Sequence, residues 1–459
     1  MKQVYIFFLF LLSMTVAHAN VVLPAIFADN MVLQQNSEIT VWGWGKPYEQ
    51  ITVVGSWNND TVKTITDNQA NWKVTLKTGN AGGPFTLTVK GYVTIELKNI
   101  LLGEVWLCSG QSNMEWSARL GIDNAQEEVA KANYPNIRFF TVNHRTALSP
   151  NFDVTGNWAV CSPETMIDFS AVAYFFAREV QKEINVPIGL INASWGGTPA
   201  EVWLPEASLG SNRVLAEAAT KIPEMGWSPR EAGRVYNAMI APITSYKIAG
   251  VLWYQGETNV ANPETYHTIF ATLINSWRQE WGYTFPFYFA QIAPFTYNES
   301  PTCGADIRNA QRQTLSVANT GMVVTADITA DTMNIHPTNK QDVGKRFAHI
   351  ALNKTYNKTQ FAVSGPLYKS HKVKGNVVTI DFDYAQGLFA KSKITGFQIA
   401  GEDKQFKPAD AIIKGTTIEV QSKQVAKPVY VRYSYRNASF IELFNAQGLP
   451  ASTFEFRIW

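Results

Sequence analysis

Hydrophobic and polar positions change their period twice along the chain. From residue 20 to about 98, alternating runs such as "EITVWGWG" and "NWKVTLK" are separated by turn-forming clusters, which is typical of antiparallel strands. Between 99 and 359, strand-like apolar runs alternate with helix-like segments, for example 169–184 and 262–281. From 360 to 459 the alternating β pattern returns. The order predicts an α/β domain with a parallel sheet, flanked by accessory N- and C-terminal β-rich regions.

The first nineteen residues have a different pattern. Lys2 precedes an apolar stretch, and the segment ends in Ala17-His18-Ala19, which matches the A-x-A cleavage pattern of secretory signals. We therefore expect a signal peptide at 1–19 and an exported protein, periplasmic or secreted. Later apolar runs are too short to predict a membrane span.

Composition narrows the classes of partner. The chain has 459 residues, a net charge of +2 and 17% charged residues, without a dense Lys/Arg run, so neither nucleic acid nor a membrane surface is an expected partner. Its three cysteines, Cys108, Cys161 and Cys303, have no metal-ligand spacing and are too few for a disulfide scaffold. We expect no metal or cofactor; a single disulfide and the oligomeric state stay open.

Polar clusters follow successive predicted strands of the central region. Residues 110–113 read Gly-Gln-Ser-Asn, 194–198 read Ser-Trp-Gly-Gly-Thr, and 255–259 read Gln-Gly-Glu-Thr-Asn. A fourth cluster, 334–337, follows the last strand. Because ligands bind beyond the carboxyl ends of parallel strands, all four clusters are expected to converge on one rim.

These clusters contain the groups that a serine esterase requires. Ser112 offers a nucleophilic hydroxyl, and its own N–H, the N–H of Gly196 or Gly197 and the Asn259 amide offer donors for an oxyanion. Because a G-x-S or Gly-Gly sequence is more often only a turn, the joint occurrence at strand ends carries the hypothesis.

Histidine is the usual base because its pKa lies near neutral pH. After the predicted cleavage five histidines remain. His336 is the one placed between a predicted strand and a helix at the expected catalytic end, where Pro337 follows it. We therefore predict His336 as the base.

At these residues the sequence resembles the sialate O-acetylesterase family of SGNH hydrolases. The motifs that carry the resemblance are "GQSNM", "INASWGGTPAEVW", "WYQGETN" and "IHPTNKQDVGKR", with further similar segments near both ends, such as "LPAIFADNMVLQQ" and "IAGEDKQFKPADA". The resemblance implies a three-layer α/β domain and removal of acetyl groups from sugar hydroxyls. It also implies that Ser112 is the nucleophile, Gly196, Gly197 and Asn259 are oxyanion donors, and His336 is the base.

One position departs from the pattern of many SGNH hydrolases. The residue three before the histidine, commonly aspartate, is Met333 here, and the residue two before is Asn334. Asp331, Asp327, a backbone carbonyl, or no group at all remain the candidates to orient His336, and a dyad or a backbone partner is preferred.

Four further residues are candidate substrate contacts, although structural roles are equally consistent with the sequence: Gln111, Gln255, Glu257 and Arg308. The preferred substrate is O-acetylated sialic acid. The alternatives are an acetyl ester of xylan or another hemicellulose and, from another class, a sugar-binding protein without turnover.

Overall fold

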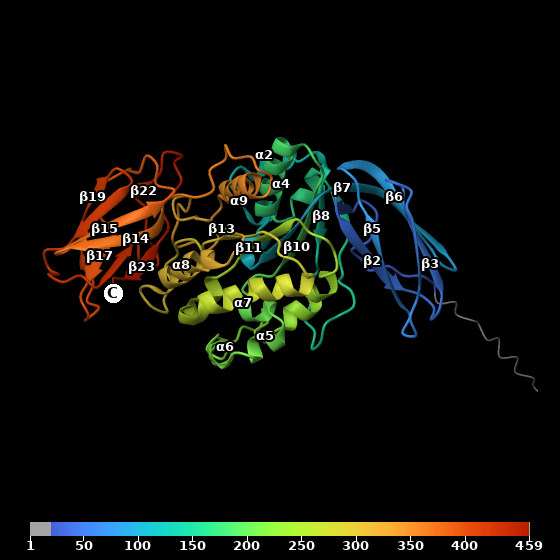
Figure 1. The fold of residues 1–459 in the computed structure, drawn as a ribbon, viewed down its shortest axis with the longest axis horizontal. Coiled ribbons are helices and arrows are strands. Elements are labelled where there is room, and N and C mark those ends of the chain that lie inside the picture. The colour runs from blue at the N-terminus through green and yellow to red at the C-terminus, as the bar shows by residue number, and fades with distance from the viewer. Residues whose placement is uncertain (1–19, 459) are drawn as a thin grey trace, which may run out of the picture.

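A seven-stranded sheet forms the centre of the computed structural model, which describes residues 20–458 (Figure 1). All neighbours in it pair in parallel except the last two, which are antiparallel. In spatial order its strands are β13 (Thr320–Val323), β12 (Phe287–Ala290), β11 (Gly250–Tyr254), β7 (Thr94–Gly110), β10 (Ile188–Ser194), β8 (Tyr134–Thr141) and β9 (Trp158–Cys161).

Helices cover both faces of this sheet because alternate side chains of each strand point to opposite sides. Trp106 packs against Phe176 of α4, with ring centroids 5.0 Å apart, whereas Trp253 packs against Phe270 of α7 at 6.0 Å. One layer contains α4 (Ala171–Ile184) and α9 (Lys340–Lys354), and the other contains α7 (Pro263–Trp281) and α8 (Cys303–Gln313). The predicted three-layer α/β fold is confirmed.

The strand β7 belongs to two parts of the molecule. Its first half pairs antiparallel with β6 (Gly82–Lys90), and its second half pairs in parallel with β10 and β11. The predicted boundary near residue 98 therefore falls inside one continuous strand. The remaining strands of the N-terminal β region are β1 (Val32–Gln34), β2 (Glu38–Trp44), β3 (Gln50–Gly55), β4 (Thr61–Ile65) and β5 (Asn71–Lys77).

The two accessory β regions lie at opposite ends of the molecule, with the α/β layers between them (Figure 1). Two four-stranded sheets and a two-stranded sheet make up the C-terminal region. They contain β14 (Leu367–Lys374), β15 (Val377–Asp383), β20 (Thr417–Gln421) and β19 (Asp410–Lys414); β18 (Lys407–Pro408), β17 (Phe397–Ala400), β21 (Tyr430–Tyr433) and β23 (Phe454–Arg457); and β16 (Phe389–Ala390) and β22 (Leu443–Phe444).

The α/β region also contains shorter helices. They include α1 (Ser112–Glu115), α2 (Ala125–Ala130), α3 (Pro163–Met166), α5 (Glu206–Gly210), α6 (Arg213–Ala219), and the single helical turns η2 (Ala200–Trp203) and η5 (Glu257–Ala261). The three cysteines are buried and unpaired. Within 20–458, no helix has the length and apolar character to cross a bilayer; the predicted signal peptide lies outside the described residues.

Candidate active site

The turn after β7 presents Ser112 at the end of the sheet. Gly110 has a φ of 133°, and a Cβ there would lie 2.2 Å from the carbonyl oxygen of Tyr254 in the neighbouring strand. Only glycine tolerates both conditions. The next residue, Gln111, donates its N–H to the same carbonyl at 3.0 Å, and α1 begins at Ser112. The close approach of two strands therefore fixes where the hydroxyl emerges.

Ser112 and His336 are in hydrogen-bond contact. The distance from Ser112 Oγ to His336 Nε2 is 2.9 Å. The imidazole stacks on Trp116 with ring centroids 4.0 Å apart, and the N–H of His336 donates to Asn334 Oδ1 at 2.9 Å. Burial, helped by the charge of Lys340, lowers the pKa of His336 to about 4. The neutral ring can therefore accept the serine proton, as a general base must.

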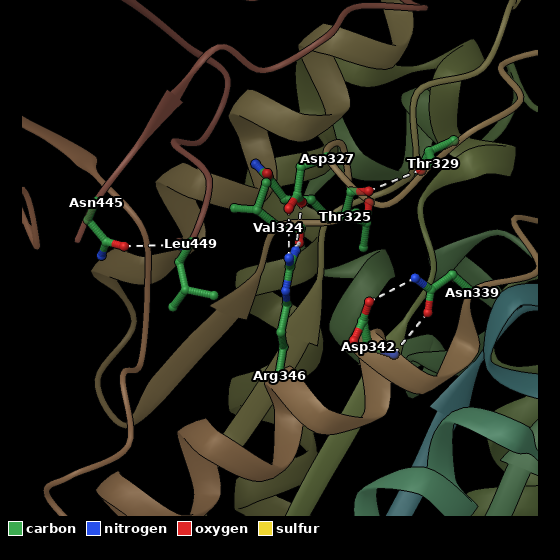
Figure 2. A network of polar contacts seen from close by, with 10 residues as sticks. Val324, Thr325, Asp327, Thr329, Asn339, Asp342, Arg346, Asn445 and Leu449 are labelled. Carbon is green, nitrogen blue, oxygen red and sulfur yellow. Dashed lines mark hydrogen bonds and ion pairs between the residues drawn. The ribbon is translucent and has the colours of Figure 1, made fainter. Parts of the chain in front are cut away.

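Neither candidate aspartate contacts that imidazole. Both oxygens of Asp327 accept hydrogen bonds from Arg346 at 2.7 Å (Figure 2), and Asp331 Oδ1 accepts from the N–H of Met333 at 2.8 Å. Among residues 20–458, His336 makes no side-chain hydrogen bond to a carboxylate. The arrangement favours a serine–histidine pair over a triad that contains either aspartate.

The second glycine motif packs directly against the nucleophile. A Cβ on Gly196 would lie 3.4 Å from Ser112 Cβ, but the N–H of Gly196 donates to Glu115 Oε2 at 2.6 Å. Gly197, with a φ of 72°, packs under Trp227. Within the described chain, the N–H groups of Ser112 and Gly197 donate no hydrogen bond. These two N–H groups are therefore the free candidates for an oxyanion hole.

A second histidine, which the sequence analysis did not select, lies beside this glycine loop. His144 Nε2 is 3.0 Å from Glu115 Oε1 and 2.9 Å from the Ser194 carbonyl oxygen, and its ring stacks on Trp195 at 4.4 Å. Burial opposes protonation, but the pairing with Glu115 outweighs it, so the pKa of His144 is raised. No local motif marks His144, because its partners come from other segments of the chain.

The side chain of Asn259 belongs to a buried polar network. It is fully buried, and its amide donates to Glu201 Oε2 at 2.9 Å and to Asn262 Oδ1 at 3.0 Å. Its Oδ1 accepts from the N–H of Ala200 at 2.9 Å. Both amide hydrogens are occupied, so the oxyanion role of Asn259 stays a prediction that requires one of these bonds to be exchanged. The sequence placed Asn259 near the strand end but did not reveal Glu201 as its partner.

A pocket of about 500 Å³ opens above Ser112 and His336. Of the four candidate substrate contacts, Gln111 and Glu257 line it. Gln255 is fully buried and donates to Gln111 Oε1 at 3.2 Å. Other residues lining the pocket include Gly196, Gly197, Met225, Trp227, Arg230, Val260, Phe295, Tyr297 and Glu299.

Arg308 lies outside this pocket. Its guanidinium is buried and donates to the backbone oxygens of Arg436 and Asn437 and to Thr453 Oγ1. These contacts join α8 to the C-terminal β region. The predicted substrate contact of Arg308 is therefore corrected to a role in holding two regions together.

Comparison with known proteins identifies the family of the chain. Residues 102–353 match the family model described as carbohydrate esterase, sialic acid-specific acetylesterase. The chain belongs to this family. Sialate O-acetylesterases from Pongo abelii and Homo sapiens are each 30% identical over 403 residues, covering 80% of this chain and 77% of theirs. A carbohydrate acetylesterase from Xanthomonas citri is 35% identical, with a TM-score of 0.86, covering 96% of this chain and 100% of that one.

Proposed function

We propose that this carbohydrate esterase hydrolyses acetyl esters on sugar hydroxyls through Ser112 and His336. The observation that carries the proposal is the 2.9 Å contact between Ser112 Oγ and His336 Nε2 beneath a pocket large enough for a sugar. A sugar-binding protein without turnover has no need of a base held against a serine hydroxyl, so this contact favours the enzyme.

The proposed reaction has two displacements. His336 removes the proton of Ser112 as Oγ attacks the acetyl carbonyl, and the N–H groups of Ser112 and Gly197 stabilise the oxyanion. His336 then protonates the departing sugar oxygen, leaving an acetyl-serine. Water repeats the sequence on this ester, releases acetate and restores the hydroxyl.

O-acetylated sialic acid is the first candidate substrate, supported by the family and by the relatives' names. A neutral acetylated glycan, such as a hemicellulose, is the second candidate, because the pocket offers little positive charge to bind a sugar carboxylate. Among the described residues that line the pocket, Arg230 is the only arginine or lysine. Its guanidinium already donates to the backbone oxygens of Gly197 and Pro223. Its third nitrogen, Nη2, has no hydrogen-bond partner but is buried, so Arg230 offers a sugar carboxylate no exposed, unengaged donor.

Release of acetate from acetylated sugars, compared with release of fatty acid from a long-chain ester, tests the proposal. The panel contains 9-O-acetylated sialic acid, acetylated xylan oligosaccharides and a long-chain ester, with Ser112→Ala and His336→Ala as controls. We expect release from an acetylated sugar that both variants abolish. A folded protein that releases neither acetate from the acetylated sugars nor fatty acid from the long-chain ester would instead support the sugar-binding alternative.

The N-terminal sequence supports a location for this activity. Residues 1–19 have the pattern of a secretory signal, so we infer that the enzyme is exported, to the periplasm or beyond. Fractionation of the producing cells tests this inference, and mass spectrometry of the mature N-terminus should show cleavage after Ala19.

A further inference from the structure

The residue that follows the nucleophile lies at the centre of a buried polar cluster. Asn113 is fully buried. Its Oδ1 accepts from Lys340 Nζ at 2.5 Å, and its Nδ2 donates to Glu257 Oε1 at 2.5 Å and to the carbonyl oxygen of Ile335 at 3.0 Å. One side chain thus connects the nucleophile turn, η5, the histidine loop and α9.

The chemistry of the partners fixes the orientation of this amide. An ammonium group has only donors, and a backbone carbonyl only accepts. The Asn113 oxygen must therefore face Lys340, and its nitrogen must face Ile335. A flipped amide would place two donors together at one end and three acceptors at the other.

The cluster contains charged groups that are costly to bury. Lys340 and Glu257 are 1% and 4% exposed, and burial lowers the pKa of Lys340 to about 7. Such groups persist when hydrogen bonds compensate their desolvation. Asn339 caps the start of α9 by accepting from the N–H of Asp342 at 3.0 Å (Figure 2). This cap fixes the position of Lys340, the first residue of α9, beside the cluster.

We propose that Asn113 is the positioning residue for His336, in place of the missing acidic partner. Asn113 holds the carbonyl of Ile335, the residue immediately before His336, and Lys340 holds the Asn113 amide in the orientation that this bond needs. The loop carrying the base is thereby fixed through its backbone to the nucleophile turn. This inference rests on the proposed esterase reaction.

The charge of Lys340 allows the proposal to be tested through the pKa of His336. Its charge disfavours the imidazolium form and contributes to the low pKa of His336. The titratable groups facing this region are Glu257 from η5, Tyr254 from β11, and His336 itself. Replacing Lys340 with methionine, which keeps the space around His336 filled, should therefore move the acid limb of kcat/KM to higher pH by removing the charge alone.

The first experiment compares Asn113→Ala with Asn445→Ala. Asn445 is also buried and also ties loops by donating to two backbone oxygens, those of Ser364 and Tyr384, but in the C-terminal β region. With p-nitrophenyl acetate, we expect Asn113→Ala to lower kcat about 10²-fold with a KM change below about threefold, because a small misplacement of a catalytic group has this cost. Asn445→Ala should lower the melting temperature and leave kcat unchanged.

A second set of variants keeps the inference testable if Asn113→Ala does not fold. Lys340→Met should lower kcat about tenfold and raise the pH of the acid limb, whereas Lys340→Arg should restore much of the rate by keeping a cationic donor. The proposal is overturned if folded Asn113→Ala keeps kcat within about threefold of the wild type, or if Lys340→Met leaves the acid limb in place.

Labelling of Ser112 by a fluorophosphonate separates this inference from the proposed function. The probe reports serine reactivity without requiring an acetylated sugar. If the wild type is labelled rapidly and Asn113→Ala slowly, the positioning role stands even when no acetyl ester is cleaved. If both proteins are labelled at the same rate, the positioning role fails, whatever the substrate.

Discussion

Two histidines lie beside the nucleophile turn in similar surroundings and have opposite acid–base properties. His336 stacks on Trp116 and His144 stacks on Trp195. His144 pairs with Glu115 and its pKa is raised, whereas the pKa of His336 falls to about 4. The Glu115 carboxylate therefore pairs with His144, whereas His336 is the histidine that contacts Ser112.

The comparison shows that a histidine–carboxylate pair does not by itself identify a catalytic base. Glu115 also accepts the N–H of Gly196, so its pair with His144 holds the glycine loop. His336 contacts the nucleophile and is kept neutral by burial. A neutral base near a hydroxyl is ready to accept a proton over a wide pH range.

The largest contrast is expected from removing each imidazole. His336→Ala should lower kcat by about 10³-fold, because it removes the general base. His144→Ala should lower it by less than about tenfold, because it loosens only the support of Gly196. Steady-state kinetics with p-nitrophenyl acetate measures both, and equal losses would contradict the division of roles.

The pH profile should show which histidine limits the rate. Since only neutral His336 accepts the proton, a pKa lowered to about 4 keeps kcat/KM flat from about pH 7 to about pH 5. Below about pH 4 the rate should fall about tenfold per pH unit. A midpoint near the ordinary histidine pKa of about 6.5 would contradict the low pKa. His144→Gln should leave the acid limb unchanged.

The two tryptophans give a smaller contrast. Trp116→Leu removes the ring that stacks on His336, and with it about 0.5–1.5 kcal/mol of aromatic contact, so kcat should fall about tenfold. Trp195→Leu changes the support of His144 and should cost less. Both kcat and the melting temperature are measured, so that the two variants are compared only while both are folded. A larger loss of kcat from Trp195→Leu would contradict the assignment of His336, and not His144, as the base.

The smallest effect is expected from Glu115→Gln. The amide oxygen still accepts the N–H of Gly196, while His144 loses the charge that raises its pKa. The pKa of His144, followed by NMR of its ring protons, should fall because burial is then opposed only by the hydrogen bond to the Ser194 carbonyl oxygen. Activity should change by less than about threefold, as for a partly exposed ion pair. An unchanged pKa would show that Glu115 does not control His144.

The sequence was sufficient to predict the groups whose position depends on strand ends. Ser112 and His336 were predicted from their places after apolar strands, and their contact is 2.9 Å. The alternation of strands and helices likewise predicted the three layers. Both predictions use backbone periodicity, which is local information.

The sequence did not predict where long polar side chains point. Asn259 follows its strand by only a few residues yet turns to buried Glu201, and Arg308 turns to the C-terminal region. The burial of Lys340 is not predicted by its sequence context, because lysine is rarely fully buried. These placements depend on partners distant in sequence, which periodicity does not reveal.

The length of β7 has a mechanical consequence. Its 17 residues begin in the N-terminal β region and end two residues before Ser112, so one stiff element connects that region to the nucleophile. The N-terminal region should therefore unfold together with the catalytic centre rather than as a separate unit. The hydrogen-bonded amides of β7 should therefore exchange with one common free energy of opening along the strand, and variants that destabilise the N-terminal sheet should also disorder the turn that carries Ser112.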